Sequence, residues 1–138
     1  MSEIKNVFDI SGRAMASQLV RLNTVASNLA NAGTISGSKE EAYRSLKPVF
    51  ATQFSNAIER NGVSTVDVVG IEAITRDPER VFMPNHPSAD GDGYVYRAAV
   101  DENEEMIEMV EASRQYQNNV EVISTLRGLM MRTINMGK

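Results

Sequence analysis

Apolar residues near the C-terminus recur at alternating gaps of three and four positions, a pattern typical of a helix that packs along one partner. The pattern runs through residues 101–135, a stretch without proline whose one glycine is Gly128. Its members are Met106, Met109, Ser113, Tyr116, Val120, Ile123, Arg127, Met130 and Ile134. A repeat of 3.5 residues predicts a long helix that supercoils around another helix, although the polar members interrupt the seam.

The expected ends of this helix agree with its periodicity. Asp101 is placed to act as the N-cap, with Glu104 three residues later in the capping-box arrangement. Acidic residues in the first turn and basic residues toward the far end suit the helix dipole: Glu102, Glu104 and Glu105, then Arg127, Arg132 and Lys138. Gly137 is the predicted stop. Such a helix would run about 50 Å, longer than a compact domain of this chain length, so it needs another long helix in the same chain or the next.

Residues 3–31 carry a second seam with the same 3.5-residue repeat. Its members are Ile4, Phe8, Ser11, Met15, Gln18, Leu22, Val25 and Leu29. Gly12 weakens the early turns by about 1 kcal/mol relative to alanine, which predicts fraying of residues 2–12 in an isolated molecule. Gly33 is the predicted stop.

Two seams at opposite ends of one chain predict a helical pair. The simpler interpretation is a hairpin within the chain, and the alternative is that the same seams also pack between copies in an assembly. Amides cluster on both helices, at Asn23, Asn28, Asn31, Gln115, Gln117, Asn118 and Asn119. They form either a solvated polar face or hydrogen bonds between helices that set the register.

The middle of the chain is rich in β-branched residues and turn residues. Residues 34–41 are expected to form a loop, and 43–54 an edge strand around Pro48. A turn at Asn61–Gly62 is followed by a predicted strand over 63–75, with a bulge near Gly70. Prolines make 77–88 irregular, and a third strand is expected over 94–100. The predicted fold is therefore α+β: an N-terminal helix (1–33), a small β-rich module (34–100) and a C-terminal helix (101–138).

Composition excludes several classes of function. The formal net charge is −4, with 42% apolar and 23% charged residues, which does not favour nucleic-acid binding. Cysteine is absent, so disulfides and thiolate chemistry are excluded. No apolar run is long enough to span a membrane, and the acidic N-terminal stretch lacks the apolar region of a cleaved secretory signal.

The chain offers little for catalysis or metal binding. His86 is the one histidine and lies in a turn-rich stretch near Asp90 and Asp92, without a second nitrogen ligand or a neighbouring nucleophile. These residues are expected to make turns before the strand at Tyr94. The glutamate run over 102–111 is typical of a solvated helix start, and the eight methionines indicate adaptable helix packing. The sequence indicates no enzyme, cofactor, metal site or small-molecule substrate.

Several motifs resemble those of the flagellar rod and hook protein family. Residues 21–31 (RLNTVASNLAN) resemble the N-terminal signature of that family. Residues 43–50, 84–95 and 105–122 resemble the blocks that characterise a proximal rod member, with Asn85 where a glycine is usual. The resemblance covers nearly the whole chain and identifies it as a member of the family.

The resemblance implies a structural role in the rod of the flagellar basal body, which serves motility. Such proteins are exported by the flagellar type III apparatus without a cleaved signal, and they assemble helically with other rod proteins into a shaft that crosses the periplasm. Their terminal helices form an inner coiled-coil layer, and their middle module faces outward. The competing interpretation is a cytoplasmic helical hairpin that serves as a binding or adaptor module.

We hypothesise that the two helices supply the contacts within and between subunits, with the amides fixing the register. The predicted interface residues are Met15, Leu22, Asn23, Val25, Asn28, Leu29, Asn31, Met106, Met109, Tyr116, Asn119, Val120, Ile123 and Met130.

Overall fold

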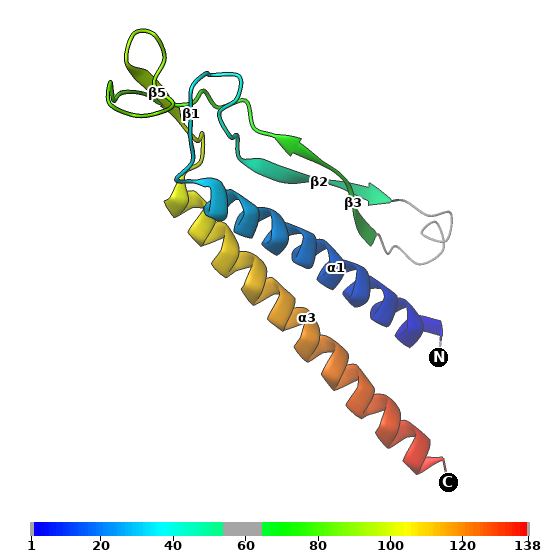
Figure 1. Ribbon diagram of the computed structural model, residues 1–138. Coiled ribbons are helices and arrows are strands. Elements are labelled where there is room, and N and C mark those ends of the chain that lie inside the picture. Colours follow the sequence, from blue (N-terminus) through cyan, green and yellow to red (C-terminus); the bar gives the residue numbers. More distant parts are fainter. Residues whose placement is uncertain (1, 54–64, 138) are drawn as a thin grey trace.

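Figure 1 shows a computed structural model of the chain, which describes residues 2–53 and 65–137. Two long helices flank the strands in sequence, which confirms the predicted α+β fold. The elements in chain order are α1 (Ser2–Asn31), β1 (Ile35–Ser36), β2 (Leu46–Gln53), β3 (Thr65–Ala73), β4 (Arg80–Phe82), β5 (Tyr94–Arg97) and α3 (Glu102–Met136). The predicted Asn61–Gly62 turn lies outside the described residues.

The start of α3 lies where the sequence predicted it. The Asp101 carboxylate accepts hydrogen bonds from the backbone N–H groups of Asn103 (3.0 Å) and Glu104 (3.2 Å). The second half of the predicted capping box is wrong, because the Glu104 carboxylate accepts from the Arg76 guanidinium at 3.1 and 3.2 Å. Glu104 is thereby used to attach the helix to the preceding chain and not to close its own first turn.

The two glycine stops behave differently from the prediction. Gly137 caps α3 but at φ −90°, on the right-handed side, and its N–H donates to the Ile134 carbonyl. The last turn of α3 contains no basic residue, so that part of the charge prediction is wrong. Gly33 is not left-handed; among the described glycines only Gly93 is, at φ 79°. The Thr34 hydroxyl and N–H both donate to the Asn31 carbonyl, so α1 ends without a left-handed residue.

The strands form two small antiparallel sheets. β2 and β3 make a two-stranded ribbon, and β1, β5 and β4 make a three-stranded sheet in that order. Val49 pairs with Gly70 and Phe50 with Val68, which leaves Val69 as the extra residue of a bulge beside Gly70, as predicted. The loop predicted over 34–41 contains β1, and the irregular stretch 77–88 contains β4. Strands of two or three residues are too short to show alternation in the sequence.

Helix α1 is the element that the other long elements share (Figure 1). It runs antiparallel to α3 on one side, because later residues of α1 contact earlier residues of α3. On another side it carries the β2–β3 ribbon, through Ser17 Oγ to the Val66 carbonyl (3.3 Å) and Arg13 to Asp67 (3.2 Å). The three-stranded sheet lies at the end where α1 stops and α3 starts. The fold therefore presents a two-helix layer with β structure on one side and at one end.

The core is small and lies near this junction. Its buried apolar residues are Val25, Ala32, Ala42, Val95, Ala98, Ala99 and Ala112. Buried polar residues are almost as numerous: Ser11, Ser17, Thr24, Asn28, Ser45 and Glu105. Since most of these side chains are small, the chain buries little apolar area by itself, and many large apolar side chains stay on its surface.

Candidate assembly interface

The helical pair has the predicted 3.5-residue repeat, but one row of α3 is shifted by one position. Its covered residues, partly or fully buried, are Glu105, Met109, Ala112, Tyr116, Asn119, Ile123, Leu126 and Met130. Met109, Tyr116, Ile123 and Met130 were predicted seam residues, and Ser113 is also partly buried. The predicted seam members Met106, Val120, Arg127 and Ile134 are exposed. The prediction favoured large apolar residues, whereas the close approach of α1 uses the small Ala112 and a paired Glu105.

The seam of α1 agrees more closely with its prediction. Ser11 and Val25 are buried, and Phe8, Met15, Gln18, Leu22 and Leu29 are partly buried. The side chain of the remaining member, Ile4, lies outside the described side chains. A second buried row, Ser17 and Thr24, faces away from this seam, and Ser17 contacts the β2–β3 ribbon. Helix α1 is therefore covered on two sides, and α3 on one.

Polar contacts fix the alignment of the two helices. Arg21 Nε donates to Glu108 Oε2 at 2.8 Å, and a second guanidinium nitrogen binds the same oxygen. Gln18 Nε2 donates to Gln115 Oε1 at 3.1 Å, about two turns farther along. The sequence-based prediction did not include Arg21 or Glu108 as interface residues. Their opposite charges beside the two seams were the available signal.

The predicted role of the asparagines in helix register is wrong in its partners. Asn28 is completely buried: its Oδ1 accepts from Leu46 N (2.8 Å) and Tyr43 OH (3.0 Å), and its Nδ2 donates to the Leu46 carbonyl (2.8 Å). It therefore fixes α1 to the start of β2 and not to α3. Asn31 and Asn119 donate to carbonyls four residues earlier in their own helices. Among the described contacts, the Gln18–Gln115 pair is the one amide pair between the helices.

The base of α3 is held by two further contacts from the chain between the helices. The buried Glu105 carboxylate accepts from the Ser45 hydroxyl. Arg76 forms an ion pair with Glu104, and that hydrogen bond, with the negative charge of Glu104, raises the pKa of the Arg76 guanidinium. Because a raised arginine pKa leaves the group charged at all physiological pH values, this pair is not a pH switch.

The residues around His86 make turns, as predicted. His86 Nδ1 accepts from Ser88 N at 3.1 Å, and Asp90 Oδ1 accepts from the N–H groups of Asp92 and Tyr94. Left-handed Gly93 completes the turn into β5. In the part of the chain that the structure describes, no three histidine, aspartate or glutamate side chains gather to hold a metal ion. None of the helices described there is both long and apolar enough to cross a bilayer.

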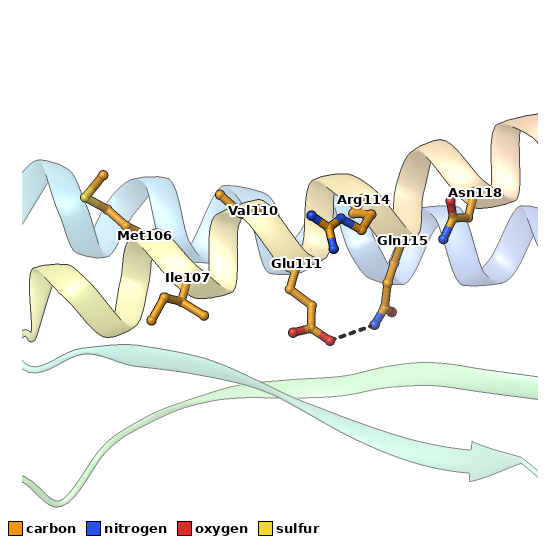
Figure 2. Close-up of a pocket in the computed structure, with 7 residues that line it drawn as sticks. All are labelled: Met106, Ile107, Val110, Glu111, Arg114, Gln115 and Asn118. Carbon is orange, nitrogen blue, oxygen red and sulfur yellow. Dashed lines mark hydrogen bonds between the residues drawn. The ribbon is translucent and has the colours of Figure 1, made fainter.

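Large apolar side chains are exposed along α3. From Ser113 to its end, no described residue of α3 is buried. Exposed apolar residues occur on both halves of the helix: Met106, Ile107, Val110, Val120, Val122, Leu129, Met131, Ile134 and Met136. Figure 2 shows one face of the first half, where Ile107 and Glu111 point toward the β2–β3 ribbon. That face lines a hollow of about 550 Å³ together with Met106, Val110, Arg114, Gln115 and Asn118. Exposed apolar surface on this scale indicates a protein that binds other proteins.

The structure divides the predicted interface residues into two groups. Eleven are partly or fully covered within the chain: Met15, Leu22, Val25, Asn28, Leu29, Asn31, Met109, Tyr116, Asn119, Ile123 and Met130. Three are exposed and free to contact another subunit: Asn23, Met106 and Val120. The arrangement has no catalytic constellation to describe. Chemically, it offers helix faces, amides and charges for protein contact.

Comparisons with known proteins agree with this picture. The family described as "Flagella basal body rod protein" matches residues 8–34, and the one described as "Flagellar basal body rod FlgEFG protein C-terminal" matches residues 92–136. The chain is 40% identical over 134 residues to the flagellar basal-body rod protein FlgC of Yersinia enterocolitica and to that of Salmonella typhimurium. It is 33% identical over 136 residues to FlgC of Buchnera aphidicola. Each of these alignments covers 96% of this chain and 97% of the relative. The chain therefore belongs to the flagellar basal-body rod protein FlgC family, whose members are structural parts of the rod and not enzymes.

Proposed function

We propose that this chain is a subunit of the proximal rod, and that it assembles helically with copies of itself and with other rod proteins into the drive shaft. The observation that carries this proposal is the second half of α3. It extends the helical layer by several turns without a buried residue, while exposing Val120, Val122 and Leu129. A solitary helix of this kind gains little from propensity alone, so its stability has to come from packing against other subunits.

The proposed interface uses the two helices in different ways. Residues in the intrachain seam, such as Val25, Met109 and Tyr116, hold the helical pair in the shape that neighbours recognise. Exposed residues, such as Met106 and Val120, make the contacts between subunits directly. In this proposal the segments 1–33 and 101–138 form the inner layer of the rod, and the segment 34–100 faces outward.

We also propose that the subunit reaches the periplasmic space through the flagellar type III export apparatus, without cleavage of a signal. The absence of cysteine supports this route, because a chain that travels unfolded through an oxidising compartment avoids wrong disulfides. The small core supports it as well, since a marginally stable fold is easily unfolded for export. Comparing the mass of the protein in purified basal bodies with that of its full sequence tests this point.

Replacing Val120 with aspartate tests the assembly role. Val120 is 42% exposed, so the charge does not disturb the fold of the subunit, but it would face an apolar contact in the rod. We expect the V120D strain to lose swimming, and the protein to be absent from purified basal bodies while remaining folded in the cell. V120T, which keeps the branched shape, is the matched control and should swim. Normal motility of V120D would contradict the proposal, and the adaptor interpretation would then need a fresh test by cell fractionation.

A further inference from the structure

The outward side of α3 carries a second stripe that contacts nothing within the described chain. It starts at Ile107, Glu111 and Arg114 and continues through Val122, Leu129 and Met136, all of them exposed. Spacings of three, four, seven or eight positions place residues on one side of a helix. This outward stripe lies away from the covered row that faces α1, and its first part lines the hollow in Figure 2.

The two halves of α3 carry opposite charge. Between Glu102 and Glu111 there are five glutamates and no basic residue. After Glu121 the charged residues of the helix are Arg127 and Arg132 alone. A helix that is acidic at its start and basic at its end repels a copy aligned in parallel without an offset, and attracts one whose basic end meets its acidic start.

From this charge pattern, and on the basis of the proposed rod function, we propose that α3 helices of successive copies overlap head to tail. The basic end of α3 of a second copy occupies the hollow at the acidic start of the first. An offset of about 20 residues, or about 30 Å, brings Arg132 of the second copy beside Glu111. Because these two positions differ by three heptads, the 3.5-residue repeat of both stripes stays in phase, and Leu129 of the second copy lies between Ile107 and Val110.

A head-to-tail contact is open-ended, whereas an antiparallel pairing of the same halves would close as a symmetric dimer. The two arrangements make the same charge pairs and differ in the size of the product. Only the open arrangement continues from copy to copy, as a shaft requires.

The natural absence of cysteine makes the test direct. In a V110C/L129C variant the two thiols of one chain lie about 28 Å apart along the helix, too far to join, so any disulfide links two chains. Oxidation of purified basal bodies, or of the concentrated full chain, should give a ladder of products beyond the dimer on a non-reducing gel. The matched control is V110C/M131C, because Met131 is as exposed as Leu129 (54% against 53%) but lies on the other side of the helix. The control should give at most one third of the ladder.

Several outcomes would overturn the proposal. A product that stops at the dimer shows the closed arrangement, and equal ladders from the two variants show an unspecific contact. Basal bodies that contain the protein but yield no ladder refute the head-to-tail contact and leave the rod function standing. Absence of the unsubstituted protein from basal bodies refutes the rod function itself.

Charge reversal keeps the proposal testable if the thiol variants fail to fold. We expect E111R and R132E each to lower self-association of the concentrated chain about threefold or more, measured by sedimentation at low salt. The double variant E111R/R132E should restore it, because the pair then meets with reversed signs. A double variant that is as weak as the product of the two single losses overturns the proposed pairing.

Discussion

The junction of the two helices and the second half of α3 differ in how they are stabilised. At the junction, Asn28, Ser45 and Glu105 are buried and bonded, and they hold α1, β2 and α3 together. Beyond Ser113, α3 makes the same 3.5-residue contact with α1, but none of its described residues is buried. One region is complete within the subunit and the other awaits a partner. Substitutions at the junction should therefore cost stability, and substitutions in the distal half should cost assembly.

The largest loss of stability is expected at Asn28. Changing it to alanine removes three hydrogen bonds and leaves the N–H and carbonyl of Leu46 without partners in a closed site. We expect a loss of about 3 kcal/mol in the free energy of unfolding, measured by urea denaturation of the purified chain. The exposed Asn23, changed to alanine, is the control and should alter stability by no more than about 0.5 kcal/mol. Similar losses for both variants would remove the contrast between the regions.

A smaller loss is expected where the helices approach most closely. Ala112 is completely buried against α1, so leucine at this position would force the helices apart. We expect A112L to destabilise the subunit by about 2 kcal/mol. The neighbouring exposed Val110, changed to leucine, adds volume without a clash and serves as the control. If A112L were neutral, the helices would have to be more loosely packed than the structure shows.

Much of this contrast could be read from the sequence, and the part that could not has a physical cause. The 3.5-residue repeat predicted both helices and their pairing, since periodicity depends only on spacing. It did not predict which row of α3 faces α1, because two adjacent rows share the repeat and the buried row contains Glu105 and Asn119. Glu105 becomes a suitable core residue only because the distant Ser45 reaches it, a contact that sequence spacing does not reveal.

The asparagines show the same limit. Their number in a helix indicated that they must have partners, and Asn28 does. Its partners, however, are the backbone of Leu46 and the hydroxyl of Tyr43, and the return of the chain over α1 brings them there. Local composition predicts that a polar group is satisfied, and only the fold shows by which atoms.

The ion pair between the helices should have a modest effect. Glu108→Gln keeps the shape of the side chain but removes the charge that Arg21 contacts. Because both side chains are partly exposed to solvent, we expect a loss of about 1 kcal/mol at low salt, which shrinks as salt is added. Glu111→Gln, on the outward face, is the control and should leave the stability of the monomer unchanged. A loss at Glu108 that does not respond to salt would show that packing, and not charge, holds this point.

The smallest effect on stability, with the largest effect on assembly, is expected in the distal half. Leu129 is half exposed, so L129A removes few contacts within the subunit. We expect its unfolding free energy to stay within about 0.5 kcal/mol of the parent chain, while its amount in purified basal bodies falls. A clear drop in the stability of the monomer would show that the distal half is already partnered within the chain.

Amide hydrogen exchange, resolved by peptide, tests the central claim most directly, because it reports where a helix is stabilised. It should be measured on the dilute monomer and on purified basal bodies. The account predicts slow exchange over residues 105–112 in both samples. Over residues 120–136 it predicts fast exchange in the monomer and slow exchange in the basal body. Equally slow exchange of the distal half in the dilute monomer would contradict the claim that other subunits complete this helix.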